Sequence, residues 1–184
     1  MARIIGISGS LRKGSYNSAL LRAAAAHSPA EMEVERASIA GIPLYDGDVE
    51  SASGLPASVT DLKDRIAAAD GLLLVTPEYN NSIPGVFKNA IDWLSRPVND
   101  IPRIFGNRPV AIMGATPGAG GTRLAQDAWL PVLRTLGTRA WFGASLYVAR
   151  ASQVFDAEGN LVDDKIRGLL SEFMARFAGF VASK

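Results

Sequence analysis

The chain has 184 residues, of which 48% are hydrophobic and 20% charged, and this balance is typical of a globular rather than a disordered protein. The absence of cysteine excludes iron–sulfur clusters, thiolate zinc sites and cysteine nucleophiles, and is compatible with a reducing compartment. A net charge of +1, without any run of like charge, argues against binding to duplex nucleic acid or to a membrane surface. We expect one domain over residues 1–184 and, because no signal-peptide pattern or transmembrane stretch is found, a cytoplasmic location.

Apolar runs and amphipathic patterns alternate along the chain. Five short apolar runs predict strands at residues 3–8, 32–38, 71–76, 109–114 and 138–146. Helical periodicity predicts helices at residues 17–27, 56–69, 85–95 and 122–136, and a last one along the apolar stripe between Ile166 and Val181. Residues 41–56 are expected to form a surface loop that is long enough to contact a partner subunit or to border a substrate site.

This alternation indicates right-handed crossovers between parallel strands. It predicts a doubly wound α/β sandwich with helices on both faces of a parallel sheet. In such sheets ligands bind beyond the carboxyl ends of the strands, where the strand order reverses. The loops after the first, third and fourth strands are therefore expected to carry the function.

The first of these loops, residues 9–18, is rich in hydroxyl groups and carries two cations. It is not a P-loop, because Ser15 stands where the lysine should be, and it lacks the G-x-G-x-x-G pattern of dinucleotide sites. Ser10, Ser15 and Asn17 can donate hydrogen bonds, Arg12 adds positive charge, and the first N–H groups of the following helix point toward an anion. The loop predicts a site for one phosphate monoester. The alternative is an ordinary turn in which Ser15 or Asn17 caps the helix.

The other two loops have features that suit a flat ligand. Residues 76–85 have a proline near each end, so Tyr79 and Asn80 are presented on a stiff segment that can stack on a planar heterocycle and bond its edge, as a flavin requires. The alternative is a proline-rich connector with a surface tyrosine. Residues 114–122 are dense in glycine, which permits close approach of the backbone and fits a lid over one ring edge. The alternative there is a flexible turn into the next helix.

The remaining polar residues predict neither a metal site nor a hydrolytic triad. His27, the only histidine, is expected at a solvated helix end. Glu78, Asp92 and Asp127 lack the spacing of metal ligands, and nothing in the chain suggests a catalytic triad.

Several motifs together resemble the NADPH-dependent FMN reductase family, and most closely its bacterial quinone and chromate reductase branch. They are Gly-Ser-Leu-Arg-Lys-Gly-Ser-Tyr-Asn at residues 9–17, Ile-Pro-Leu-Tyr-Asp at 42–46, Thr-Pro-Glu-Tyr-Asn at 76–80, and Pro-Gly-Val-Phe-Lys-Asn-Ala-Ile-Asp-Trp-Leu-Ser-Arg at 84–96. The resemblance spans most of the chain. It implies a flavodoxin-like fold, a three-layer sandwich whose five-stranded parallel sheet has the strand order 2-1-3-4-5.

The resemblance also implies non-covalent FMN and a set of residues that bind it. These are Ser10, Leu11, Arg12, Lys13, Gly14, Ser15, Tyr16 and Asn17 around the phosphate, Pro77, Glu78, Tyr79 and Asn80 beside the ring, and Ala115 and Gly118 in the third loop. Relatives commonly have a serine where this chain has Ala115, so any hydrogen bond to the ring from this position must come from the backbone. A homodimer or homotetramer with the flavin near the subunit boundary is implied as well, and it would give the exposed side of the helix that carries Trp93 a partner.

We therefore expect an FMN enzyme that takes a hydride from NADPH or NADH and reduces quinones, with chromate, azo or nitro compounds as poorer acceptors. No protein acid, base or nucleophile is required, because hydride moves between stacked rings. Arg12, Lys13 and Arg123 are candidates for contact with the 2′-phosphate of NADPH.

Two other hypotheses stay open at this point. A flavodoxin-type electron carrier would act without turning over a small substrate, but such carriers tend to be strongly acidic and this chain is not. A nucleotide-binding regulatory module without a flavin would purify colourless.

Overall fold

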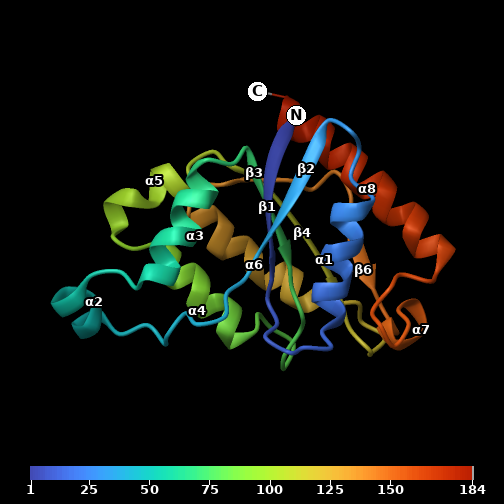
Figure 1. Ribbon diagram of the computed structural model, residues 1–184, viewed down its shortest axis with the longest axis horizontal. Coiled ribbons are helices and arrows are strands. Elements are labelled where there is room, and N and C mark those ends of the chain that lie inside the picture. The colour runs from blue at the N-terminus through green and yellow to red at the C-terminus, as the bar shows by residue number, and fades with distance from the viewer. Residues whose placement is uncertain (184) are drawn as a thin grey trace.

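A parallel sheet forms the centre of the molecule in the computed structural model, which describes residues 1–183 (Figure 1). The four long strands are β1 (Ala2–Ser8), β2 (Met32–Ala37), β3 (Gly71–Val75) and β4 (Pro109–Ala115). With β5 (Arg139–Ala140) they follow the order β2-β1-β3-β4-β5, and all neighbours are parallel. The predicted doubly wound order is confirmed. It reverses beside β1, so the loops after β1 and β3 leave the sheet at adjacent positions.

The fifth position of the sheet differs from the single strand predicted at residues 138–146. It is divided between β5 and β6 (Leu146–Val148), which pair with opposite ends of β4. Between them Trp141 turns into the core against Phe173 and Phe177, with ring centroids 4.9 and 5.5 Å away. Phe142 is 72% exposed. The chain therefore leaves the sheet to bury one indole ring, and returns to it beside the carboxyl end of β4.

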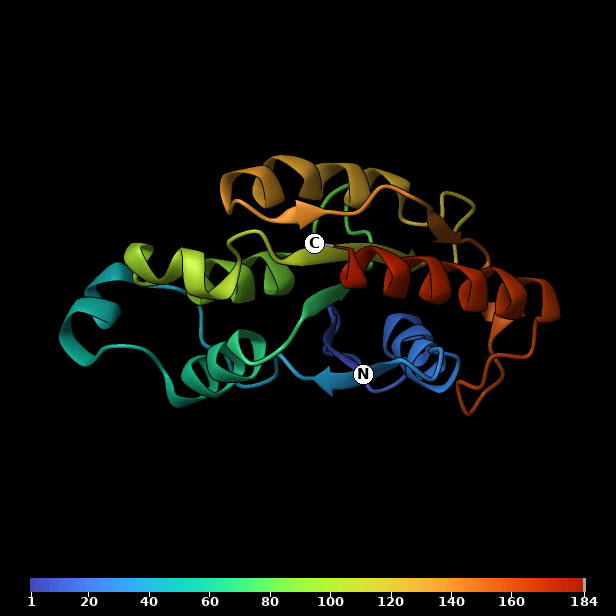
Figure 2. The same ribbon diagram turned by 90° about the horizontal axis from the view of Figure 1, so that it is seen from above.

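Helices cover both faces of the sheet. On one face lie α1 (Tyr16–Ala26) and α8 (Asp164–Ala182), whose apolar side chains form a core with β2 and β4. On the other lie α3 (Ala57–Ala67), α4 (Gly85–Leu94) and α6 (Arg123–Thr135), which bury Trp93 and Trp129. Figure 2 shows α1 and α8 on one side of the strands and α3 and α4 on the other. Because β1 and β3 are covered on both faces, their residues are apolar at nearly every position.

Short helices occupy segments in which the sequence predicts none. The predicted loop at residues 41–56 contains α2 (Gly47–Ser53), which begins where the Asp46 side chain accepts a hydrogen bond from the Asp48 N–H group. It buries none of its residues and projects from the side of the molecule in Figure 1. The others are η1 (Val98–Asp100), α5 (Ile101–Ile104) and α7 (Ala151–Val154). Over residues 1–183, no helix has both the length and the apolar character needed to pass through a membrane.

Candidate functional site

The loops that follow β1, β3 and β4 border one open cavity at the carboxyl end of the sheet. The sequence-predicted residues that line it are Ser10, Arg12, Ser15, Tyr16, Asn17, Pro77, Glu78, Tyr79 and Ala115. Thr116 and Pro117 complete the lining. The other predicted residues, Leu11, Lys13, Gly14, Asn80 and Gly118, are exposed nearby and do not contribute to it. Three segments distant in sequence are thus brought together where sheets of this kind bind ligands.

The first loop offers several hydrogen-bond donors to the cavity. Ser15 is the N-cap of α1, and its Oγ accepts from the Ser18 N–H group at 3.2 Å while its own hydroxyl hydrogen stays free to donate. The helix-capping alternative is therefore right for Ser15, and capping is compatible with binding. Within residues 1–183 the backbone N–H groups at 13–17 have no internal acceptor, and the exposed Arg12 makes no ion pair. A cation, hydroxyl groups and unpaired N–H groups at a helix N-terminus suit a phosphate dianion.

Asn17 differs from its expected role as a phosphate donor. Its side chain is 4% exposed and faces the backbone of Ala115, where its Nδ2 group donates to the carbonyl at 2.8 Å and its Oδ1 accepts from the N–H group at 2.9 Å. This reciprocal pair joins the first loop to the end of β4. It also occupies the N–H group of Ala115, so the hydrogen bond expected from this backbone to a flavin ring is not available.

Glu78 connects the second loop to the third. Its Oε2 accepts from the Ala125 N–H group at 3.0 Å, in the first turn of α6. The N-cap of that helix, Thr122, has a φ of 64° and its side chain makes no cap hydrogen bond, so Glu78 provides the capping acceptor from another loop. Glu78 therefore ties the second loop to the first turn of α6.

The tip of the second loop is a tight hairpin turn. Tyr79 and Ser82 exchange two backbone hydrogen bonds of 3.2 and 3.1 Å, and the two residues between them, Asn80 and Asn81, have φ values of 50° and 59°. Two residues in the left-handed region inside such a pair form a type I′ turn, in which asparagine is favoured. The turn holds Tyr79, which is 45% exposed, at the edge of the cavity. Asn80 contributes its backbone conformation to this turn.

Buried packing beneath the loops sets how closely they approach. A Cβ atom on Gly9 would lie 2.1 Å from the ring of Phe87, which packs edge-on against Trp129 at 4.9 Å. The Trp129 indole donates to the hydroxyl of Thr76 at 3.2 Å. A Cβ atom on Gly114 would lie 2.2 Å from the Thr76 carbonyl oxygen. None of these contacts was predicted, although the glycines at the ends of both strands are a visible signal of close approach.

The assembled donors suit FMN. The first loop holds a phosphate-binding set, and the exposed ring of Tyr79, with Pro77 and Pro117, provides flat apolar surface for a planar group. Glu78 is the one carboxylate in the lining, and its Oε2 accepts from the Ala125 N–H group at the start of α6. Among residues 1–183, no three His, Cys, Asp or Glu side chains are grouped closely enough to hold a metal ion.

The family model for NADPH-dependent FMN reductase matches residues 2–153. The chain belongs to this family. As an NADPH-dependent FMN reductase family member, it is an oxidoreductase with FMN as its cofactor and NAD(P)H as its co-substrate. The recognition made from the loop motifs is thereby confirmed.

Individual relatives agree with this assignment to the FMN reductase family. The chain is 46% identical to an NAD(P)H-dependent FMN reductase of Pseudomonas aeruginosa over 92% of its length and 90% of that protein's. It is 38% identical to a 2-hydroxy-1,4-benzoquinone reductase of a Burkholderia species over 99% and 97% of the two chains. Among solved structures, the flavoenzyme NAD(P)H:(acceptor) oxidoreductase FerB of Paracoccus denitrificans superimposes with a TM-score of 0.87, at 32% identity and over 98% and 97% of the two chains.

A more distant structure supports the fold alone. The WrbA-like flavodoxin of Agrobacterium tumefaciens has a TM-score of 0.64 at 17% identity, over 98% of both chains. The flavodoxin-like fold expected from the resemblance is confirmed.

Proposed function

We propose that this protein is a quinone reductase that takes a hydride from NAD(P)H and delivers electrons to a quinone through FMN held between its three loops. The observation that carries the proposal is the single cavity in which free phosphate donors of the first loop face the tyrosine turn of the second. A relative named as a benzoquinone reductase over nearly the whole chain supports a quinone as acceptor. Chromate, azo and nitro compounds are proposed as poorer acceptors.

The chain's own residues act by binding and orientation. Arg12, the Ser15 hydroxyl and the unpaired N–H groups of the first loop hold the phosphate. Tyr79 provides a rigid surface beside the ring plane, because the type I′ turn leaves its backbone little freedom. FMN held by these residues would supply the redox chemistry between the nicotinamide and the acceptor. The protein contributes proximity and a preorganised environment for hydride transfer between stacked rings.

We further propose that residues 1–184 act as one FMN-binding domain in the cytoplasm, assembled as a homodimer or homotetramer. A groove between α4 and α6 supports a partner on that side of the molecule. Its lining includes Ile91, Ile101, Pro131 and Val132, and Lys88 and Asp92 form an ion pair of 2.6 Å at its edge. A second copy of the chain would cover apolar surface there.

The phosphate assignment is tested by the double variant Arg12→Ala/Ser15→Ala. We expect it to fold, because the cap at Ser15 contributes only about 1 kcal/mol, but to lose FMN during gel filtration and to lose NAD(P)H oxidation with a soluble benzoquinone. Absorbance of the protein peak near the flavin bands, followed by the turnover assay, measures both effects. Lys165→Ala, which removes an exposed cation on α8, is the control and should retain FMN.

Two outcomes would contradict the proposal. If the double variant kept its yellow FMN absorbance, Arg12 and Ser15 would not be the residues that hold the phosphate. Wild-type protein that holds FMN but does not oxidise NADPH or NADH in the presence of quinone would instead be an electron carrier.

A further inference from the structure

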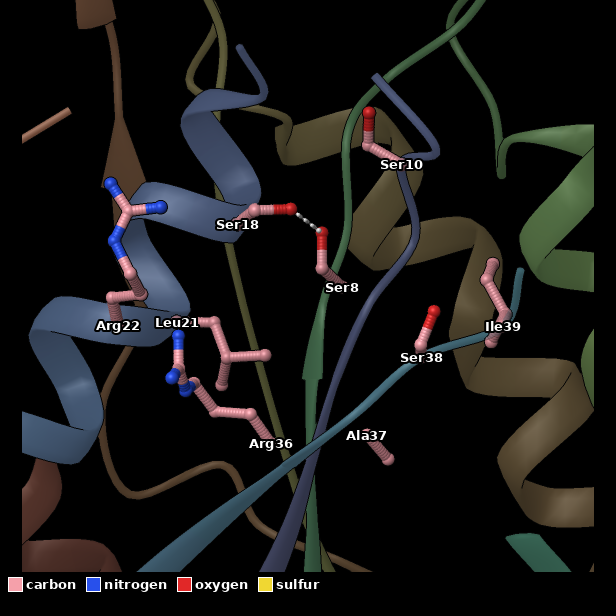
Figure 3. A pocket seen from close by; sticks show the side chains of 9 residues that line it. All are labelled: Ser8, Ser10, Ser18, Leu21, Arg22, Arg36, Ala37, Ser38 and Ile39. Atoms are coloured by element: carbon pink, nitrogen blue, oxygen red, sulfur yellow. Dashed lines mark hydrogen bonds between the residues drawn. The ribbon is translucent and has the colours of Figure 1, made fainter. Parts of the chain in front are cut away.

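A second cavity adjoins the FMN cavity at the carboxyl ends of β1 and β2 (Figure 3). It lies beside α1. Its lining consists of Ser8, Ser10, Ser18, Leu21, Arg22, Arg36, Ala37, Ser38 and Ile39. Because Ser10 lines both cavities, a molecule bound over the flavin site can extend into this one.

The second cavity is cationic. Arg22 borders it from α1 with its guanidinium directed to the far side of that helix, Arg36 lines it from β2, and no carboxylate is part of the lining (Figure 3). Arg22 donates to the carbonyl oxygens of Glu158 and Gly159 at 3.2 and 2.9 Å, which positions its guanidinium without neutralising it. The exposed Arg36 forms no ion pair with any residue of the described chain. The nearby carboxylate on β2, that of Glu35, is bound by other arginines and does not pair with Arg36.

The carboxylate of Glu35 forms its ion pairs on the other face of β2. Arg3 and Arg65 both bind its carboxylate, Arg65 at 2.7 Å, and these guanidinium groups hold its pKa below the usual range. Residues 35 and 36 point to opposite faces of the strand, so Glu35 does not reach the cavity. The cavity beside α1 therefore keeps an unneutralised positive charge that an anion can use.

Hydroxyl groups surround the same space. Ser18 donates to the Ser8 Oγ at 3.0 Å, and Ser8, which is 8% exposed, has no acceptor for its own hydroxyl hydrogen within residues 1–183. Ser38 accepts from the Ala40 N–H group at 3.1 Å and likewise keeps a hydrogen to donate. A free guanidinium group with several hydroxyl donors matches the oxygens of a phosphate monoester better than it matches a neutral ligand.

We infer that this cavity binds the 2′-phosphate of NADPH and sets the preference of the enzyme for NADPH over NADH. The inference rests on the proposed function, which places the nicotinamide end over the flavin. Arg36, near the end of β2, lines this cavity, and within residues 1–183 its guanidinium has neither an ion pair nor a hydrogen-bond partner, so we assign the 2′-phosphate to it. The candidates Arg12, Lys13 and Arg123 lie outside this cavity.

Arg36→Ala tests the inference in the FMN-loaded enzyme. We expect KM for NADPH to rise about tenfold or more, since a charge-assisted contact to the phosphate is lost, while KM for NADH and kcat with either donor stay within about twofold. Arg36→Lys should recover part of the effect, because it keeps the charge without the planar fork. Arg134→Ala on α6, which removes an exposed arginine on the opposite face of the sheet, is the matched control and should change neither KM.

A binding measurement separates this inference from the proposed function. Isothermal titration of the FMN-loaded wild type should show tighter binding of adenosine 2′,5′-bisphosphate than of AMP, and Arg36→Ala should remove the difference. This difference in nucleotide affinity is expected even if the protein reduces no quinone. The inference is overturned if the two nucleotides bind equally, if Arg36→Ala raises both KM values alike or neither, or if inorganic phosphate binds as tightly as the bisphosphate.

Discussion

Two side chains join the loops of the site to one another. Asn17 and Ala115, which are 98 positions apart, share two hydrogen bonds, and Glu78 caps α6 from a position 47 residues earlier. Asn17 and Glu78 were both expected to contact the ligand. In the structure they satisfy backbone groups of the neighbouring loop, and thereby determine where the ligand-facing residues lie. Their role in the site is positioning.

Asn17→Leu is expected to destabilise the protein and to weaken FMN binding. The variant removes both partners of a buried N–H group and a buried carbonyl group, so the free energy of unfolding should fall by about 3 kcal/mol. Urea unfolding and fluorescence titration with FMN measure the two effects. Asn99→Leu, at an exposed position in η1, is the control. An unchanged unfolding midpoint in Asn17→Leu would show that the reciprocal pair does not stabilise the loops.

At the scale of elements, the stiffness of the second loop has a source that differs from the expected one. The sequence predicts that the prolines near both ends constrain the loop, but the tip is held by the type I′ turn through Asn80 and Asn81. Asparagine is one of the few residues with a side chain that enters the left-handed region at low cost. The two adjacent asparagines therefore indicate a type I′ turn.

Substitutions at Asn80 should separate backbone conformation from side-chain contact. Asn80→Gly is expected to keep both stability and FMN affinity, because glycine adopts a positive φ freely. Asn80→Val should lower the free energy of unfolding by about 1–2 kcal/mol and weaken FMN binding, since the turn that carries Tyr79 is strained. Thermal melts and FMN titration are the measurements. A loss of FMN affinity in Asn80→Gly as large as in Asn80→Val would assign the amide itself to the ligand.

At the scale of the whole molecule, a buried ion pair joins α3 to the segment after α4. Lys63 is 1% exposed, donates to the carbonyl oxygen of Arg96, and lies 2.8 Å from Asp100. Arg103 and Lys63 hold the pKa of Asp100 well below its usual range. The ionised form of Asp100 is therefore favoured by folding, and its contribution to stability is present above the unfolded-state pKa and lost as the pH falls toward the folded-state value.

Asp100→Asn should lower the free energy of unfolding by about 3 kcal/mol at pH 7, because Lys63 loses its buried charge partner. The difference from wild type should stay constant above about pH 5 and shrink below about pH 4 as the wild-type carboxylate becomes protonated. Urea unfolding across this range measures it. A difference that grows on acidification would contradict the assignment. Asp61→Asn, whose side chain is 69% exposed, should show little effect at any pH.

An element can be predicted from the sequence when the interactions that form it join residues close together in the chain. The four long strands and five main helices follow from apolar runs and stripes, which reflect local burial. The polar helix α2 has no apolar stripe, and the break between β5 and β6 depends on a distant pocket for Trp141, so neither was predicted. The phosphate-binding roles of Ser15 and Arg12 follow from the chemistry of their loop and stay a prediction, whereas the partners of Asn17 and Glu78 lie too far along the chain to be inferred from a local pattern.

The bond between Glu78 and Ala125 bears on the biogenesis of the protein. During translation the loop after β1 and the tyrosine turn leave the ribosome before Ala125. The hydrogen bond from the Ala125 N–H group to Glu78, which fixes the end of the third loop, cannot form until then. The cavity bordered by the three loops is therefore completed late in translation.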